Sequence, residues 1–258
     1  MSDDKGKIKS EAETQEADYP FDSEEAKNAF FWEYPFEKDS HIPSCLSISD
    51  IKKKYIEYSG EENEETVYKS EKADKKNGEK SGLSAAEKGT VMHCVMEHLD
   101  FKKDYDLNQL ETFIEKMVSD GILTQEEADS VNRNKVLNFF ASDLGKRAKK
   151  SKMLFKEESF AMEFPPSEIY MGDKYGDTKE GIIVHGIIDC YFYEDDEIVL
   201  YDYKTDYVEK GREAEIADKY KVQLSVYKRA IEAATGKVVK DAYIYFFFID
   251  KELKLSLK

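Results

Sequence analysis

Two carboxylates, a lysine and an imidazole occur in this sequence at spacings that suit chemistry on a phosphodiester. Asp189 ends the run G-I-I-D, Asp202 and Lys204 follow within D-Y-K-T, and His93 lies upstream in G-T-V-M-H. Carboxylate oxygens favour Mg²⁺ or Mn²⁺, and a lysine beside such a cation can stabilise charge that develops on a phosphate. The set therefore indicates a metal-dependent phosphodiesterase.

A β-hairpin would bring the two carboxylates together. Residues 184–193 and 198–207 are rich in β-branched and aromatic side chains, and a short acidic segment separates them. With residues 195–196 at the centre of the turn, antiparallel pairing sets Asp189 opposite Asp202. Opposed Cβ atoms lie roughly 4.5 to 5.5 Å apart, where like charges destabilise a sheet. A divalent cation that bridges the two carboxylates would remove this repulsion.

The same hairpin decides where the lysine points. Side chains alternate along a strand, so Lys204 shares a face with Asp202 and leaves only the backbone carbonyl of Tyr203 near the cation. The alternative is that Asp202 and Lys204 form an ordinary ion pair on a solvated hairpin, because exposed pairs of this kind are common and contribute little.

Two predicted helices carry further polar candidates. Residues 84–101 show an apolar stripe at helical spacing with His93 on an adjacent line, and residues 212–235 form a second such pattern closed by Gly236. Gln223 lies beside the buried face of the second helix. A buried glutamine needs hydrogen-bond partners, which favours contact with the site or a nucleotide. The alternative is a half-exposed position at the edge of the stripe.

The ordered motifs resemble the nuclease domain of RecB-like exonucleases, and more narrowly the C-terminal nuclease portion of AddA-type helicase/nuclease subunits. The resemblance spans roughly residues 30–250 and rests on the following segments: W-E-Y-P-F (32–36), L-S-I-S-D-I-K (46–52), G-T-V-M-H (89–93), G-I-I-D (186–189), D-Y-K-T-D (202–206) and Q-L-S-V-Y (223–227).

The resemblance implies a role for each matching residue. It implies His93, Asp189 and Asp202 as metal ligands, joined by the backbone carbonyl of Tyr203, and it gives Lys204 the role of the catalytic lysine.

Three further positions follow from the resemblance. Gln223 and Tyr227 match a Q-x-x-x-Y motif that is expected to act with the catalytic residues by supporting the lysine and the nucleic-acid backbone. Glu158, in K-E-E-S-F, sits where relatives carry an acidic residue before a strand.

The resemblance also sets expectations for cofactors. Mg²⁺ or Mn²⁺ is the expected ion. An iron-sulfur cluster of the kind some relatives carry needs four cysteines, and this chain has three, so none is expected. They are Cys45, Cys94 and Cys190. The chain lacks a G-x-x-x-x-G-K-[ST] phosphate loop, so no ATP site is expected in it.

The fold class and function follow from the order of elements together with the resemblance. Helical patterns come first and strand patterns follow, which suits an α/β fold: a restriction-endonuclease-like mixed sheet flanked by helices, with an N-terminal helical extension. The resemblance implies a DNA exonuclease domain within a helicase/nuclease that processes double-strand breaks for recombinational repair. The implied partners are single-stranded DNA ends, the helicase domains of a parent chain and a second, AddB-like subunit. Two alternatives are a non-catalytic DNA-binding or scaffolding module and a stand-alone exonuclease.

Composition adds a constraint on DNA binding. The net charge is -16, which is unfavourable for holding a polyanion, yet one basic run could contact phosphates. The alternative for this run is a solvated helical face. The candidate DNA-binding residues in it are Arg133, Lys146, Arg147, Lys149 and Lys150. No apolar run reaches the roughly 20 residues of a membrane span, and no signal peptide is recognisable, so the cytoplasm is the expected location.

The predicted organisation is a polar tail or linker end followed by one nuclease domain. The tail covers 1–22, the nuclease domain 23–258, and a charged mobile loop 60–82. Further helices are expected at 107–118 and 125–140, the second with a capping box at Thr124, and further strands at 153–164 and 238–250.

Overall fold

The structure is a computed structural model of the 258-residue chain. The residues that it describes are Glu24, Asn28, 31–32, 37–59, 82–170, Thr178, 180–209 and 211–257. The predicted tail at 1–22 lies outside these residues, as does the predicted loop at 60–82 apart from Gly82. The chain divides into an N-terminal unit, Met1–His41, whose described part includes helix α2, and a main unit, Ile42–Lys258, which holds all the other elements below.

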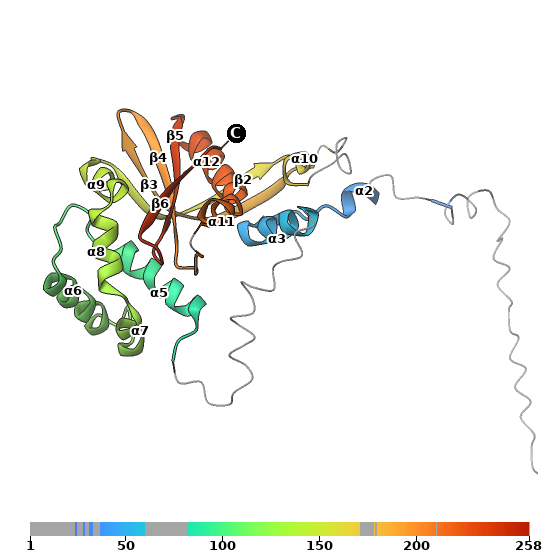
Figure 1. Ribbon diagram of the computed structural model, residues 1–258. Coiled ribbons are helices and arrows are strands. Elements are labelled where there is room, and N and C mark those ends of the chain that lie inside the picture. Colours follow the sequence, from blue (N-terminus) through green and yellow to red (C-terminus); the bar gives the residue numbers. More distant parts are fainter. Residues whose placement is uncertain are drawn as a thin grey trace, which may run out of the picture. The chain divides into compact units, whose positions relative to one another are not determined.

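Six strands of the described residues form one mixed sheet (Figure 1). They are β1 (Cys45–Ser47), β2 (Leu154–Phe164), β3 (Ile182–Glu194), β4 (Glu197–Lys204), β5 (Val239–Phe246) and β6 (Lys251–Leu255). The hydrogen-bonded order is β1-β3-β4-β5-β6, and β2 also pairs with β3. Pairs β1·β3 and β4·β5 are parallel and the remaining pairs are antiparallel. The predicted α/β fold with a mixed sheet flanked by helices is confirmed.

The hairpin that carries the predicted site is confirmed. Strands β3 and β4 pair with Cys190 opposite Tyr201, which is the register predicted from a turn centred on Asp195 and Asp196. The two turn residues have φ values of 52° and 68°. A two-residue turn of type I′ needs positive φ at both positions and matches the twist of the strands that it joins, so this turn fixes the register.

Ten helices are described. They are α2 (Glu37–Ser40), α3 (Ile48–Ser59), α5 (Ala85–His98), α6 (Leu107–Ser119), α7 (Gln125–Ser130), α8 (Arg133–Ala141), α9 (Asp143–Lys150), α10 (Pro166–Ile169), α11 (Glu213–Asp218) and α12 (Lys221–Thr235). Among the described residues, no helix is both long and apolar enough to cross a membrane.

Two predicted helices are each divided into two. The capping box of Thr124 with Glu127 is confirmed, but α7 ends at Ser130, and Asn132 caps a new helix by accepting a hydrogen bond from the backbone N–H of Lys135. The pattern at 212–235 likewise divides into α11 and α12, and the second ends, as predicted, at a left-handed Gly236. The predicted strand 238–250 also stops early, and a turn leads into β6.

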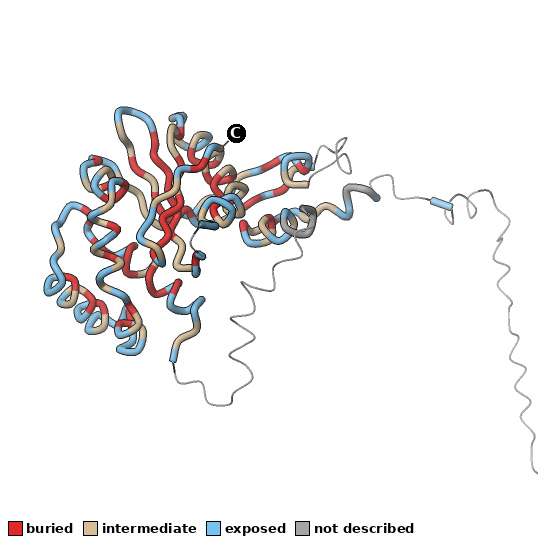
Figure 2. The backbone as a smooth tube through the Cα atoms, in the orientation of Figure 1, coloured by how far each residue is buried: buried red, intermediate tan, exposed pale blue. Residues whose placement is uncertain are grey.

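Helices cover both faces of the sheet in the main unit (Figure 1). Helices α5 to α9 pack on one face around a buried cluster that includes Val95, Phe139 and Tyr201. Helices α3 and α12 pack on the other face around a cluster that includes Ile51 and Leu224. Figure 2 shows the buried backbone concentrated along the central strands and the inward sides of the helices. The core is therefore two apolar layers with the sheet between them.

Strand β3 turns its side chains over at Asp189. Ile188 belongs to the cluster below α3 and α12, whereas Cys190, two residues later, belongs to the cluster below α5 to α9. Residues two apart on a regular strand share a face, so the strand is rotated at this point. The register of β2 with β3 sets Glu157 across from Asp189, and Glu157 has a φ of 50°, which a residue with a side chain rarely adopts. The irregularity thus falls on two acidic residues.

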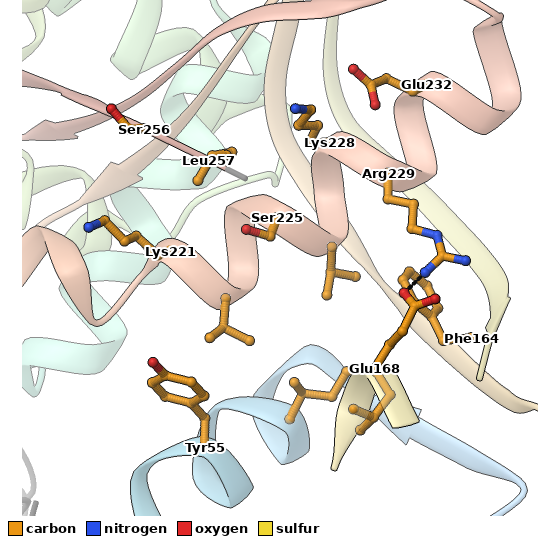
Figure 3. Close-up of a pocket in the computed structure, with 14 residues that line it drawn as sticks. Tyr55, Phe164, Glu168, Lys221, Ser225, Lys228, Arg229, Glu232, Ser256 and Leu257 are labelled. Atoms are coloured by element: carbon orange, nitrogen blue, oxygen red, sulfur yellow. Dashed lines mark ion pairs between the residues drawn. The ribbon is translucent and has the colours of Figure 1, made fainter. Parts of the chain in front are cut away.

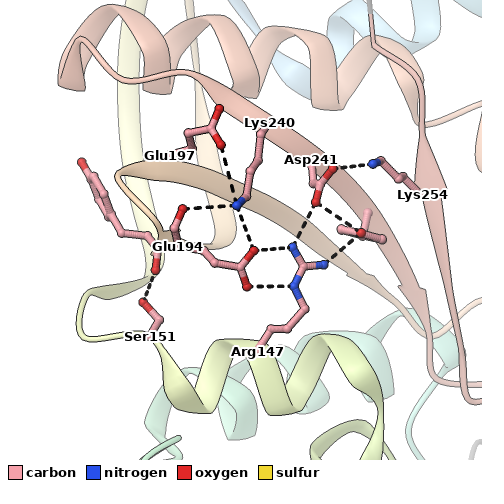
Figure 4. A network of polar contacts seen from close by, with 9 residues as sticks. Arg147, Ser151, Glu194, Glu197, Lys240, Asp241 and Lys254 are labelled. Atoms are coloured by element: carbon pink, nitrogen blue, oxygen red, sulfur yellow. Dashed lines mark hydrogen bonds and ion pairs between the residues drawn. The ribbon is translucent and has the colours of Figure 1, made fainter.

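An ion-pair network joins helix α9 to the sheet (Figure 4). Arg147 donates to both carboxylate oxygens of Glu194 at 2.9 and 3.0 Å, to Asp241 at 3.0 Å and to the hydroxyl of Tyr243 at 2.9 Å. Lys240 lies 3.0 Å from the same glutamate. The hydrogen bonds from Arg147 bring the pKa of Glu194 down to about 2. This network docks the C-terminal helix of the α5 to α9 layer.

We expect Arg147→Met to lower the free energy of unfolding by about 2 kcal/mol, because Glu194 loses its bidentate partner and Asp241 loses one hydrogen bond. Lys146→Met is the matched control. The Lys146 side chain is 60% exposed, and its one ion pair, with Asp143, is long at 4.0 Å, so the change should cost less than about 0.5 kcal/mol. Urea unfolding measures both values.

The stabilisation by Arg147 should also depend on pH. Because the pKa of Glu194 is lowered on folding, its contribution is present above the ordinary glutamate pKa of 4.5 and is lost as the pH falls toward about 2. The difference in unfolding free energy between the parent and Arg147→Met should therefore shrink over that range. Equal losses in Arg147→Met and Lys146→Met would contradict this role.

Candidate functional site

Three side chains from three different elements meet beside the sheet. His93 of α5 places Nδ1 3.6 Å from Oε1 of Glu157 on β2 and 3.6 Å from Oδ2 of Asp189 on β3. The possible ligand atoms of these residues all lie within 4.8 Å of one another. Their side chains are 27%, 22% and 9% exposed, so the group is open to solvent on one side. An imidazole and two carboxylates fit a divalent cation such as Mn²⁺ or Mg²⁺.

A second set of polar side chains surrounds Asp202, which is fully buried. Gln223 of α12 donates from Nε2 to Oδ1 of Asp202 at 2.8 Å and to the hydroxyl oxygen of Tyr227 at 2.9 Å. The ammonium group of Lys204 forms an ion pair with the same carboxylate. Oε1 of Gln223 is buried and accepts no hydrogen bond from the described residues. This acceptor remains available next to the acid and the lysine.

The backbone of β4 links the two sets. The N–H of Tyr203 donates to Oδ2 of Asp189 at 2.9 Å, and the Tyr203 ring meets the ring of His93 edge to face, with the centroids 5.8 Å apart. Because Asp202 and Lys204 flank Tyr203 in the chain, the D-Y-K segment positions both sets at once. The two sets therefore form one continuous site.

Gly89 explains how helix α5 comes close enough to contribute His93. Gly89 is buried, and a Cβ atom at this position would lie 2.9 Å from the hydroxyl oxygen of Thr205, just beyond the D-Y-K segment. That separation is shorter than a normal contact, so a larger residue would require the Thr205 side chain or α5 to move. The glycine of the G-T-V-M-H motif thus allows α5 to lie close to the end of β4, one helical turn before His93.

The electrostatics of the site favour a bound cation. Burial raises the pKa of Asp202, the charge of Asp189 raises it further, and Lys204 opposes both. Burial acts to lower the pKa of His93, but the interactions with the Glu157 carboxylate and with the charge of Asp189 outweigh it, so the pKa is raised. Three carboxylates thus face one lysine and one histidine, and a divalent cation would reduce their mutual repulsion.

The structure brings most of the predicted site residues together. His93 and Asp189 are in contact, and Asp202 joins Lys204, Gln223 and Tyr227. Gln223 is buried, as the core-facing interpretation required. Asp202, however, is not part of the three-residue group, because its carboxylate is held by the glutamine and the lysine. The roles of these residues as ligands and catalytic groups stay predictions, including that of the Tyr203 carbonyl.

Sequence reasoning missed Glu157. The residue considered from the K-E-E-S-F segment was Glu158, but its side chain is exposed and it is absent from the group of possible ligands. The alternation of side chains along a regular strand cannot show which of two adjacent glutamates faces the site where the strand itself rotates. The only signal in the sequence was the presence of two acids in a row before a predicted strand.

The predicted DNA-binding run is largely engaged within the protein. Arg133, Arg147 and Lys149 form ion pairs with acidic side chains of other segments. Lys146 and Lys150 are exposed on α9. The three paired residues link the helices to one another and to the sheet. Of the five residues predicted to contact DNA, two are therefore presented to solvent.

A cavity of about 570 Å³ lies elsewhere on the main unit, between α3, α10, α12 and Leu257 (Figure 3). Tyr55 and Lys221 line it, and Arg229, which pairs with Glu168, lies at one side. None of the residues of the two polar sets lines this cavity. The candidate site is therefore a partly open group beside the sheet and not the cavity.

The sequence pattern that defines the PD-(D/E)XK nuclease superfamily matches residues 67–256. The matched region contains Asp189 and the D-Y-K segment at 202–204, which has the (D/E)-x-K form. It carries Ile188 where the name of the superfamily has a proline. The mixed sheet flanked by helices agrees with this match.

Among curated proteins, the chain is similar to the A subunit of the ATP-dependent helicase/nuclease from several bacteria. It is 39% identical over 231 residues to that of Clostridium novyi (strain NT) and 42% identical over 217 residues to that of Thermoanaerobacter sp. (strain X514). These alignments cover 87% and 83% of this chain but 18% of each relative, so the chain spans less than a fifth of their length. With the match over residues 67–256 and the D-Y-K site described above, the chain belongs to the PD-(D/E)XK nuclease superfamily.

Proposed function

We propose that this chain is a divalent-metal-dependent DNA exonuclease domain that hydrolyses phosphodiester bonds. The observation that carries the proposal is the junction of two sets of side chains in a member of a nuclease superfamily. One set, His93 with Glu157 and Asp189, offers ligands to a cation, and the other couples a buried carboxylate to Lys204. Acids and a lysine in this relation suit attack on a phosphate.

The first set would hold Mg²⁺ or Mn²⁺. His93, Glu157 and Asp189 would be ligands, and Asp202 with the Tyr203 carbonyl would complete the site. When bound, such a cation offsets the negative charge of the phosphate and lowers the pKa of water. The N–H of Tyr203 holds one oxygen of Asp189, which fixes the orientation of that carboxylate in advance.

Lys204 would act on the reacting phosphate. Its side chain is 15% exposed, and its ion pair with Asp202 holds it at the edge of the site. Burial lowers the pKa of Lys204, but Asp202 and Asp189 raise it more, so the net pKa is raised and the amine is cationic at neutral pH. A fixed cation can stabilise charge that builds up on phosphate oxygens.

Gln223 and Tyr227 would support the catalytic lysine, through the Asp202 carboxylate, and the nucleic-acid backbone. Nε2 of Gln223 holds Asp202 and contacts Tyr227, while Oε1 remains able to accept a hydrogen bond. The amide holds the carboxylate that pairs with Lys204, so its removal should slow the reaction without removing the ligands of the first set.

The name of the relatives supports a wider setting for the domain. We propose that it works within an ATP-dependent helicase/nuclease that processes double-strand breaks for recombinational repair in the cytoplasm. Helicase domains of a parent chain would supply ATP hydrolysis and deliver single-stranded ends, and a second, AddB-like subunit would be a partner. Because three of the predicted phosphate contacts are engaged internally, delivery by other domains suits this chain.

We expect the unmutated 258-residue protein, the parent of the variants below, to cleave end-labelled single-stranded DNA when Mg²⁺ or Mn²⁺ is present. Cleavage should stop when EDTA removes the ion. Asp202→Asn should lower the rate at least about 100-fold, because it keeps an acceptor for Gln223 but loses the charge that holds Lys204. Lys204→Met should have a similar effect. Circular dichroism checks that each variant is folded. Cleavage in EDTA, or full activity of Asp202→Asn, would contradict the proposal.

Glu157 and Glu158 offer a matched pair for the ligand assignment. Glu157→Gln should weaken Mn²⁺ binding about tenfold or more, because a neutral amide replaces one of the two carboxylates beside His93. Glu158→Gln changes the same type of residue one position later, where it is exposed, and should bind Mn²⁺ as the parent does. Isothermal titration measures both affinities. The assignment fails if the two variants are equally affected.

A further inference from the structure

Lys52 lies next to the catalytic lysine of the proposed site. Its Nζ is 4.6 Å from the centroid of the Tyr220 ring, and Nζ of Lys204 is 4.9 Å from the same ring. The Tyr220 hydroxyl donates to Oδ2 of Asp206 at 2.7 Å, which fixes the ring. Two cationic groups from α3 and β4 are thus gathered around one aromatic side chain at the edge of the site.

The start of helix α3 is held firmly, so the position of Lys52 is well defined. Strand β1 pairs with β3 immediately before the helix. The hydroxyl and backbone N–H of Ser47 donate to Oδ2 of Asp50 at 2.6 and 3.0 Å. Ile48 and Ile51 are buried in the core. Lys52 follows Ile48 by one helical turn, so the two side chains lie on the same face of α3, and Lys52 reaches the Tyr220 ring.

The charge of Lys52 is not neutralised as that of Lys204 is. Lys204 is paired with Asp202, but among the residues that the structure describes no carboxylate forms an ion pair with Lys52. Its side chain is half-buried, and burial, followed by repulsion from Lys204, lowers its pKa. Asp202, Asp206 and Asp189 attract Lys52 without forming an ion pair with it, so its ammonium group keeps attraction for a further anion.

The geometry points to Lys52 as a phosphate-binding residue that contacts a backbone phosphate of the DNA strand next to the scissile one. This inference rests on the proposed nuclease function, because that function supplies the anion that the Lys52 charge would meet. A strand whose scissile phosphate lies at Lys204 would bring the adjacent phosphate past the Tyr220 ring. Lysine is well suited to such a contact as a compact point charge without base preference.

Binding of single-stranded DNA tests the inference without any cleavage. Fluorescence anisotropy with a labelled oligonucleotide, in Ca²⁺ in place of Mg²⁺, compares the parent with Lys52→Met, which keeps the apolar stem and removes the charge. We expect about fivefold weaker binding and a slope of log K against log salt that is smaller by about 0.7, the value for one phosphate contact on a single strand. Lys52→Arg should restore most of the affinity.

Lys53→Met is the matched control, because Lys53 is the next residue of α3 and is exposed. It should leave the affinity and the salt slope as in the parent. The inference is overturned if Lys52→Met retains the parental slope, if Lys53→Met lowers it equally, or if the parent does not bind at low salt. Thermal unfolding of each variant separates a loss of contact from a loss of fold.

Steady-state cleavage separates this inference from the proposed function. Lys52→Met should raise the KM for single-stranded DNA about fivefold with kcat within about twofold of the parent, since the residue binds a phosphate that does not react. A fall in kcat alone would overturn the assignment. If the parent does not cleave at all, the proposed function fails, while the salt slope still decides whether Lys52 contacts a phosphate.

Discussion

The gathering of three acidic side chains on neighbouring strands is the constraint on which the rest of this structure depends. Glu157, Asp189 and Asp202 lie on β2, β3 and β4, and like charges at this spacing oppose the pairing of the strands that carry them. His93 of α5 lies beside Glu157, and Lys204 of β4 forms an ion pair with Asp202. The part of the sheet that holds these residues therefore keeps a local excess of negative charge, and that excess is what a divalent cation would relieve.

The part of the site that could be predicted from sequence is the part governed by local geometry. The two-residue turn fixes the β3·β4 register, so the approach of Asp189 to Asp202 followed from counting, and Gln223 followed from its place on an apolar helical face. Glu157 could not be chosen over Glu158 because the strand rotates there. The rule that side chains alternate along a strand does not hold at a residue with positive φ. Helix breaks and the short strands β1 and β6 were missed for a related reason, since tertiary pairing and caps decide them.

The distribution of basic side chains bears on the proposed binding of DNA by an acidic chain. Arginines and lysines of the helical layer, such as Arg147, are bound to carboxylates of the sheet and serve the fold. Of the five basic residues predicted to contact DNA, only Lys146 and Lys150 remain exposed on that side. Lys52 and Lys204 are different, because both lie at the Tyr220 ring beside the acidic group. In the proposed complex these two lysines would meet phosphates at the reacting site once a cation offsets the three carboxylates, and the net charge of the chain does not report their position.

The carboxylates of the site are oriented by hydrogen bonds and an ion pair within the protein. The N–H of Tyr203 fixes Asp189, and Gln223 and Lys204 fix Asp202, so the carboxylates are oriented by the protein itself. The positive φ of Glu157 costs about 1 kcal/mol or more, and such strain persists only where the surrounding structure enforces it. Here the β2·β3 ladder on either side enforces it. Orientation energy is thus supplied during folding, and an arriving cation would need only to displace water and screen charges that already face one another.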